Sequence, residues 1–276
     1  MCKVLKVSES GYYRWLKSRI KPSKRQLLLV EIQNILSEHP DNSNYGYDRI
    51  HKALNIKGIK VSRNTVYRAM KLGGLIHKAK RPHSLTKSTT EIQEQENIIK
   101  RDFSSPKPLK KLLTDITEVQ CSDGKLYISP VMDCFNGEII ALEMRDNMKK
   151  ELCIDTIVQL KNKFANLNDV VLHSDRGSQY TSEAFKETLN SYGMIQSLSG
   201  AGHCYDNARM ESFFATLKKE KLYKIHTYRL TKSEVKTIVF RYIFIYYNRK
   251  RITSFNPQYL PPSEYRVLYQ SKKMVA

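Results

Sequence analysis

Three acidic residues are the strongest candidates for chemistry in this chain of 276 residues: Asp115, Asp175 and Glu211. Asp175 closely follows the apolar residues 170–172, although buried strands usually end in small or uncharged residues. Asp115 lies within an alternating stretch, where a buried charge without a purpose costs several kcal/mol. Mg²⁺ prefers carboxylate oxygens, and two such ions about 4 Å apart can activate a hydroxyl and stabilise the leaving oxygen of a phosphodiester. The three residues therefore indicate metal-dependent phosphoryl transfer.

The composition indicates a polyanionic partner. Lys and Arg number 47 against 27 Asp and Glu, which gives a net charge of +20. Nucleic acid is the first candidate, with a ribosomal or membrane-surface protein as the alternative. Five cysteines without C-x-x-C spacing indicate reduced thiols and no zinc site. The longest apolar run, residues 238–247, is far shorter than the roughly 20 residues of a membrane span. We expect a cytoplasmic, nucleoid-associated protein with no membrane contact.

Residues 25–77 are predicted to form a helical DNA-binding domain. Two short helical patterns, 46–58 and 61–75, meet at a turn that contains Gly58, and Ser62 is a good N-cap for the second. This order of elements is typical of a helix-turn-helix, although a small helical bundle with a basic, solvated face is the alternative. In a helix-turn-helix the outer face of the second helix would meet bases and phosphates. The DNA contacts predicted on that face are Arg63, Asn64, Arg68 and Lys71.

The stretch from residue 109 onward predicts a mixed five-stranded sheet flanked by helices. Three closely spaced strand patterns indicate an antiparallel meander, and alternating helices and strands follow it. If the first and fourth strands are neighbours, Asp115 and Asp175 face each other at one end of the sheet. Glu211 then lies on a long helix, with Asn207 and Lys218 on the same helical face. The predicted strands lie within 109–120, 124–137, 138–144, 169–175 and 195–199, and the helices within 149–164, 182–193, 206–223 and 231–251.

The segments around the three acids carry a specific resemblance. The stretches LLTD, HSDRGSQYTS and CYDNARMESFFATLKKE resemble the integrase-type catalytic core of bacterial insertion-sequence transposases, which are relatives of retroviral integrases. The resemblance implies a ribonuclease-H-like fold and an Asp-Asp-35-Glu triad formed by Asp115, Asp175 and Glu211. Among 27 acidic residues, some pair with 35 residues between its members is expected by chance. The surrounding motifs therefore carry the identification, and the spacing does not.

The resemblance also implies a function and a set of supporting residues. The expected reaction is cleavage and strand transfer at the ends of an insertion sequence, with Mg²⁺ as cofactor and Mn²⁺ as a substitute. The expected partners are element ends, target DNA and further copies of the chain, and the chain is expected to be the product of a second reading frame, with a partner encoded upstream. His173 either orients a carboxylate ligand or packs at the strand end. The other residues expected to contact DNA are Gln179, Asn207 and Lys218.

The chain departs from the family in the uncharged stretch 200–202, where a Lys or Arg is usual, and at Thr253 and Asn256 near its end.

Two functions from other classes remain open. One alternative is a non-catalytic, sequence-specific DNA-binding protein that acts at element ends. The other is a structural RNA-binding protein, which leaves Asp115 without a role.

The expected organisation of the chain has five parts. They are an N-terminal segment 1–24, a helix-turn-helix domain 25–77, a basic linker 78–108, a catalytic core 109–225 and a C-terminal helical extension 226–276.

Overall fold

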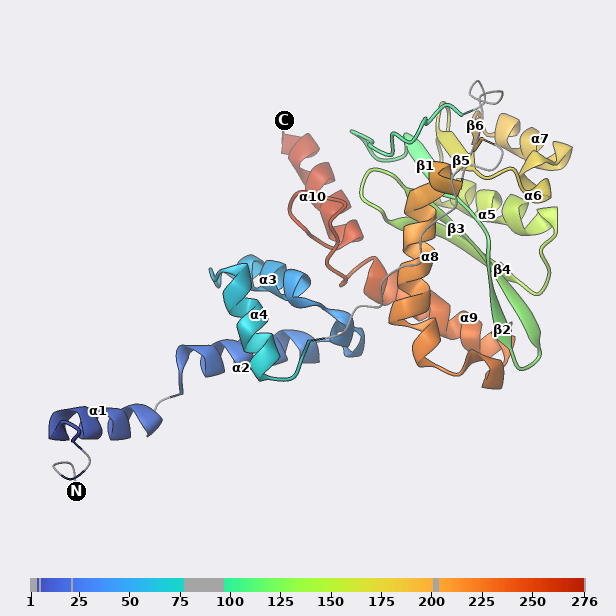
Figure 1. Cartoon of the computed structure of the whole chain (residues 1–276). Helices are drawn as coiled ribbons and strands as arrows, with labels where there is room; N and C mark the ends of the chain where they lie inside the picture. Colours follow the sequence, from blue (N-terminus) through green and yellow to red (C-terminus); the bar gives the residue numbers. More distant parts are fainter. Residues whose placement is uncertain (1–3, 5, 21, 77–96, 201–203, 276) are drawn as a thin grey trace. The chain divides into compact units, whose positions relative to one another are not determined.

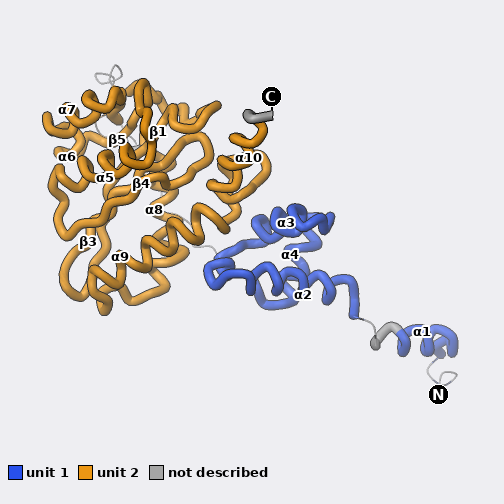
Figure 2. Tube along the Cα trace, turned by 180° about the vertical axis from the view of Figure 1, so that it is seen from behind, with its two compact units in different colours: residues 1–83 blue, residues 84–276 orange. Residues whose placement is uncertain are grey.

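The computed structural model divides the chain into two compact units, residues 1–83 and 84–276 (Figures 1 and 2). It describes residues 4, 6–20, 22–76, 97–200 and 204–275. Most of the expected linker 78–108 therefore lies outside the described residues, and its last part belongs to the second unit. The expected C-terminal extension also belongs to the second unit, so it shares one compact body with the catalytic core.

The first unit is helical, as predicted. Its core is formed by fully buried residues from three helices, among them Ile32, Ile50 and Val66. Gly58 ends one helix with a φ of +80°, which glycine adopts without strain. The next helix begins after Ser62, whose hydroxyl accepts a hydrogen bond from the Thr65 N–H. The elements are α1 (Glu9–Ile20), α2 (Lys24–Ser37), the 3₁₀ turn η1 (Pro40–Asn44), α3 (Tyr47–Ile56) and α4 (Arg63–Leu72).

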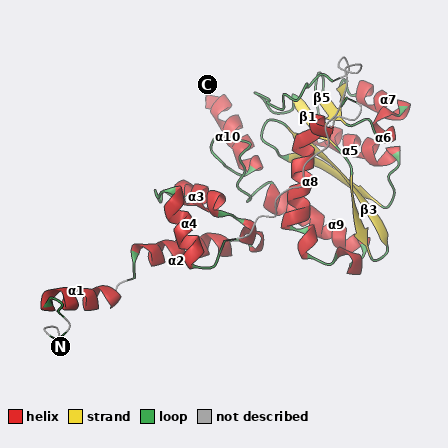
Figure 3. Ribbon diagram, in the orientation of Figure 1, coloured by secondary structure: helices red, strands yellow, loops and turns green. Residues whose placement is uncertain are grey.

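The second unit is built on one mixed sheet flanked by helices, which confirms the predicted fold class (Figure 3). The sheet runs in the order β2-β3-β1-β5-β6, and β4 pairs with β3 alone. The first three predicted strands form an antiparallel meander, whereas β1, β5 and β6 are parallel. The strands are β1 (Lys111–Thr114), β2 (Thr117–Cys121), β3 (Gly124–Asp133), β4 (Ile139–Arg145), β5 (Val171–Ser174) and β6 (Ile195–Leu198).

The first predicted strand is broken at Asp115, so the sheet has six strands where five are predicted. Strands β1 and β2 pair with β3 in the same register, and the gap between them places Asp115 opposite Pro130. Proline has no N–H to donate, which interrupts a ladder of hydrogen bonds at that point. Asp115 therefore lies in the break between β1 and β2 and not in mid-strand, and its carboxylate accepts the N–H of Ile116 at 2.8 Å.

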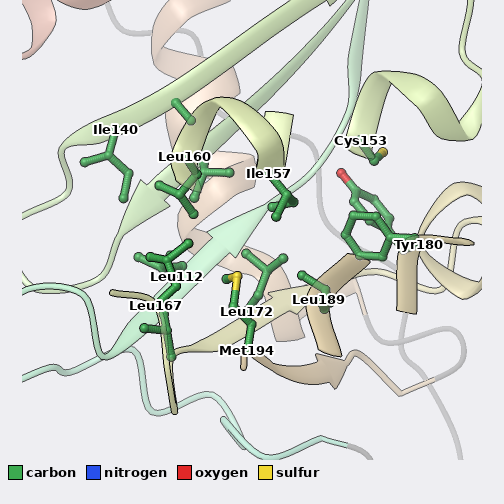
Figure 4. Packing of buried hydrophobic residues seen from close by; sticks show 14 residues of the cluster. Leu112, Ile140, Cys153, Ile157, Leu160, Leu167, Leu172, Tyr180, Leu189 and Met194 are labelled. Atoms are coloured by element: carbon green, nitrogen blue, oxygen red, sulfur yellow. The ribbon is translucent and has the colours of Figure 1, made fainter. Parts of the chain in front are cut away.

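Helices cover both faces of the sheet. Side chains of alternate strand residues, such as Leu112 and Leu172, pack with residues of α5 and α7 in one buried cluster (Figure 4). The intervening residues, such as Leu113 and His173, point to the opposite face, where α8 lies against β1. The helical elements are α5 (Lys150–Lys163), α6 (Ser178–Thr181), α7 (Glu183–Ser191), η2 (Cys204–Asn207), α8 (Ala208–Glu220), η3 (Leu222–Lys224), η4 (Thr227–Arg229), α9 (Lys232–Arg241), η5 (Tyr242–Tyr247) and α10 (Pro262–Val275).

The C-terminal helices are fixed to the core by a buried ion pair. The Arg251 guanidinium donates two hydrogen bonds of 2.9 Å to Glu220 at the end of α8, and the Tyr242 hydroxyl donates a third of 2.8 Å. The predicted helix 231–251 begins at its capping box but widens into a π-helix, η5. The wider turn buries both Tyr242 and Tyr246. The segment that contains Arg251 is therefore part of the second unit.

The outer edge of β4 is covered by side chains. The Asn248 amide pairs with Ile139 as a strand would, accepting its N–H at 3.0 Å and donating to its carbonyl at 2.9 Å. The Gln159 side chain accepts the N–H of Leu142, and the Lys163 ammonium donates to the carbonyl of Ile140. These contacts satisfy backbone groups that an edge strand leaves open.

No helix in the described parts of the chain is long and apolar enough to span a bilayer.

Candidate active site

The two aspartates lie at the same end of neighbouring parallel strands. Strand β1 pairs with β5 so that Leu113 lies beside His173. Continuing this register by two residues places Asp115 beside Asp175, one residue beyond the end of each strand. Residues two apart share a face of the sheet, so both aspartates follow the face on which α8 lies. The predicted neighbourhood of the first and fourth strands is confirmed.

Glu211 completes an acidic cluster over Asp115. It lies in the first turn of α8, and its negative charge acts on Asp115 together with that of Asp175. Burial and these two charges raise the pKa of Asp115 to about 7, against the lowering effects of the Ile116 N–H and the Lys218 ammonium. Burial also raises the pKa of Glu211. The Ile116 N–H and the Lys218 ammonium are therefore too weak to offset the effect of burial and of the two neighbouring carboxylates on Asp115.

The carboxylate groups of Asp115, Asp175 and Glu211 do not surround a shared metal position. Asp115 accepts the N–H of Ile116, and Asp175 accepts the N–H of Gly177 at 3.0 Å. Among the residues that the structure describes, no group of three or more Asp, Glu, His or Cys side chains is arranged to hold a metal ion.

The donor set nevertheless fits a hard divalent cation. Three carboxylates supply oxygen ligands, and a cation would offset the repulsion that raises the pKa of Asp115. Asn207 adds a buried side-chain oxygen that has no hydrogen-bond partner among the described residues. The residues present therefore suit Mg²⁺ or Mn²⁺ better than zinc, which favours sulfur and nitrogen ligands.

His173 is hydrogen-bonded to two serines at the neighbouring strand. Its ring is fully buried, with Nδ1 at 2.8 Å from Ser197 Oγ and Nε2 at 3.1 Å from Ser199 Oγ. Burial lowers the pKa of His173, which favours the neutral ring. Of the two roles considered, packing at the strand end accounts for these contacts, because they join β5 to the chain around β6.

The three residues expected to contact DNA around the site have different environments. Asn207 is 4% exposed and its NH₂ group donates to the Thr114 carbonyl at 3.0 Å, so that half of the amide is engaged within the protein. Gln179 donates to the carbonyl of Met148 at 2.8 Å. Lys218 is half-buried and close enough for its charge to act on Asp115, as its predicted position on the Glu211 face requires.

Asp206 is a site residue that the sequence analysis missed. Its buried carboxylate accepts hydrogen bonds from Arg101 Nε at 2.7 Å, Asn97 Nδ2 at 2.8 Å and the Gly200 N–H at 3.0 Å. These contacts fasten both ends of the connection between β6 and α8 to the segment that precedes the core. The signal available in the sequence was the place of Asp206 within the motif CYDNARMES, next to residues already singled out.

The predicted DNA-contacting residues of α4 divide into two kinds. Arg63 is ion-paired with Asp48 of α3 through Nε and Nη2, and it also donates to the Tyr47 hydroxyl at 3.2 Å. Its guanidinium therefore joins the two helices. Three other predicted residues have exposed side chains on this helix: Asn64, Arg68 and Lys71.

The fold and the acidic cluster define the class of protein as an integrase-type catalytic core with a ribonuclease-H-like sheet. Comparison with protein families agrees. Residues 105–204 and 211–268 match integrase core domains, and residues 23–83 match an HTH-like domain. Among solved structures, the HTLV-2 integrase catalytic core domain in complex with magnesium covers 57% of this chain and 95% of its own, with 16% identity and a TM-score of 0.42.

Relatives of full length give the family. The protein InsK of insertion sequence element IS150 from Escherichia coli K12 is 34% identical over 96% of this chain and 92% of its own length. The transposase InsF of IS3A from the same strain is 31% identical over 91% and 88%. The transposase of IS904 from Lactococcus lactis is 34% identical over 85% and 93%. The chain belongs to the insertion-sequence transposases with an integrase core, and is a DDE-type polynucleotidyl transferase.

The raised pKa of Asp115 predicts a pH-dependent stability without metal. Its folded pKa of about 7 exceeds the ordinary 3.8, so the folded state keeps a proton that the unfolded chain has released. This contribution to stability is full below about pH 4 and is lost as the pH rises to about 7. We expect the Tm in chelator to fall between pH 5.5 and pH 7.5, and to fall less in Asp115→Asn, as measured by differential scanning fluorimetry. Equal slopes for the two proteins would contradict the assignment.

Proposed function

We propose that this transposase cuts DNA at the ends of an insertion sequence and joins the freed 3′-hydroxyl to target DNA, using Asp115, Asp175 and Glu211 as metal ligands. The observation that supports the proposal is that Asp115 and Asp175 follow neighbouring parallel strands and that Glu211 is close enough for its charge to act on Asp115. Burial and these two charges raise the pKa of Asp115. A cluster of three carboxylates, with Asp115 partly buried and Asp175 and Glu211 exposed, on a protein of charge +20 is suited to a phosphodiester substrate and its cations.

The residues of the site have distinct proposed roles. Bound between the three carboxylates, Mg²⁺, or Mn²⁺ in its place, would lower the pKa of the attacking hydroxyl and stabilise the leaving oxygen. Lys218, whose charge acts on Asp115, is proposed to neutralise a DNA phosphate. Tyr180 is buried beneath the site, and its hydroxyl lies 3.3 Å from Thr114 Oγ1, which supports the end of β1.

The DNA partners follow from the two units. The exposed basic face of α4 is proposed to recognise the inverted repeats at the element ends, and the second unit to receive the cleaved strand. We further propose that several copies assemble on DNA, because both ends must be joined to one target. Joining to a product of an upstream reading frame is proposed to complete the active protein.

The test is an assay with a labelled duplex taken from the inverted repeats beside the coding frame. Wild-type protein is expected to cut the end and join it to a second duplex in Mg²⁺ and in Mn²⁺, and to bind with little or no cleavage in Ca²⁺. The assay is run with the chain alone and with the upstream product supplied. Binding without cleavage in every metal, in both arms, would favour the alternative of a non-catalytic DNA-binding protein.

The contacts of α4 predict different outcomes for its two arginines. Arg68→Ala is expected to weaken binding to the element end by about 5- to 150-fold, the equivalent of roughly 1–3 kcal/mol for a base contact, with a smaller loss on random DNA. Arg63→Ala is expected to lower the Tm as well, since it releases Asp48 and Tyr47 of α3. Arg25→Ala on α2 is the control for charge. Equal losses on both DNAs for Arg68→Ala would show that this residue supplies charge without sequence recognition.

A further inference from the structure

Asn207 connects the two segments that carry catalytic carboxylates. It is the residue before α8, and Glu211 lies one helical turn further on. Its side-chain amide donates a 3.0 Å hydrogen bond to the carbonyl of Thr114, the last residue of β1 and the neighbour of Asp115. The side chain is 4% exposed, so water offers no ready substitute for this bond. One amide thus fixes the start of the helix that bears Glu211 to the end of the strand that precedes Asp115.

The other half of the same amide is left without a partner. A carbonyl can only accept, so the NH₂ group of Asn207 must face Thr114 and its oxygen must point elsewhere. That oxygen, Oδ1, is buried and has no hydrogen-bond partner among the described residues. An unpaired buried acceptor typically costs about 1–3 kcal/mol. Such a cost is expected where a group from outside the chain completes the bond.

Asn248 shows that this situation is not general for buried asparagines in the second unit. It is 3% exposed and also binds a backbone carbonyl, that of Ile139, at 2.9 Å. Its oxygen, in contrast, accepts the Ile139 N–H at 3.0 Å, so both halves of the amide are satisfied. Asn248 lies on the edge of β4, whereas Asn207 lies at the end of β1. Among the described residues of the second unit, the buried asparagine with an unpaired oxygen is therefore the one beside the acidic cluster, although Asn42 of the first unit also has an unpaired Oδ1.

We propose that Asn207 is a positioning residue for the metal site. Its NH₂ group fixes α8 on β1 so that Glu211 and Asp115 can share a cation, and its Oδ1 accepts a hydrogen bond from the hydrated cation when it binds. This inference rests on the proposed function, because it takes the three carboxylates as the ligands. It replaces the predicted DNA contact of Asn207 with a role inside the protein.

The test measures metal affinity directly. Asn207→Leu keeps the branched shape and the number of heavy atoms of the side chain and removes both polar atoms, and Asn248→Leu is the matched control. We expect Mg²⁺ and Mn²⁺ binding, measured by calorimetry on the full chain without DNA, to weaken about 10- to 100-fold in Asn207→Leu, the usual cost of losing a partner of metal ligands. Asn248→Leu is expected to lower the Tm while leaving metal affinity at the wild-type value. Asn207→Ser, too short to reach Thr114, serves as the second variant if the leucine variant does not fold.

Cleavage gives an independent readout. The Mg²⁺ concentration for half-maximal cleavage should rise in Asn207→Leu by the same factor, and the rate at saturating Mg²⁺ should recover to within a few-fold of wild type. Wild-type metal affinity in both Asn207 variants would overturn the inference, and so would an equal loss of metal affinity in Asn248→Leu. In either case, cleavage by the wild-type protein would leave the proposed function intact. A wild type that binds metal with the expected Asn207 dependence but never cuts DNA would overturn the function alone. Absence of metal binding by the wild type would overturn both.

Discussion

Glu211→Gln is expected to abolish DNA cleavage and strand transfer together. The substitution keeps the size of the side chain but removes one negative charge from the cluster that acts on Asp115. Because the proposed function assigns one set of ligands to both steps, both rates should fall by more than about 100-fold, since even the loss of an outer partner of a metal ligand costs 10- to 100-fold. Binding to the element end should persist or tighten slightly, because a charge that repels phosphate is removed. A labelled end duplex, assayed for cleavage, joining and binding in Mg²⁺ and Mn²⁺, measures all three.

The control for this variant is Glu187→Gln, the same change on an exposed residue of α7. It should cut and join at the wild-type rate. Wild-type cleavage by Glu211→Gln would remove Glu211 from the metal site. Loss of joining alone, with cleavage intact, would contradict the proposal that one site performs both steps.

Arg251→Met is expected to be the most destabilising single substitution considered for the second unit. Arg251 is 5% exposed and donates two hydrogen bonds to Glu220, which is 8% exposed. Removing the arginine leaves a buried carboxylate without its cation, a change that typically costs about 3–5 kcal/mol. For a unit of this size the Tm should fall by on the order of 10 °C. Thermal unfolding followed by circular dichroism measures the loss.

Two further variants show whether burial is the cause. Lys125→Ala breaks the exposed pair between Lys125 and Glu118, and should change the stability by no more than about 1 kcal/mol. Arg251→Met combined with Glu220→Gln leaves no unpaired charge buried, so part of the loss should return. Equal losses for the exposed and the buried pair, or no recovery in the double variant, would contradict this account.

The sequence was sufficient to predict the fold class and to place Asp115 and Asp175 at the ends of neighbouring strands. Hydrophobic alternation placed most strands within a few residues, and Asp115 and Asp175 could be matched because parallel strands end at the same edge. The break at Asp115 could not be predicted in the same way. It depends on Pro130 lying opposite in the register of β3 on β1 and β2, and register is a property of the paired strands.

Long-range partners account for the rest of what the sequence did not reveal. Asp206 accepts hydrogen bonds from Asn97 and Arg101, more than a hundred residues earlier, and no local pattern announces such pairs. The ion pair between Glu220 and Arg251 likewise joins a helix end to a segment that looked like a separate extension. Local periodicity reports which face of an element is buried, but it does not report which distant side chain completes a polar contact.

The covered edge of β4 has a practical consequence for protein preparation. A fragment that stops at residue 225 would lack Asn248, which pairs with Ile139, and Arg266, which pairs with Asp133. The peptide groups of Ile139 and the carboxylate of Asp133 would then lose these hydrogen-bond partners. Open strand edges recruit other strands, so such a fragment would be prone to join copies of itself edge to edge and precipitate. We therefore expect the residues after 225 to reduce aggregation by covering the edge of β4. A catalytic fragment intended to stay in solution should continue through Arg266.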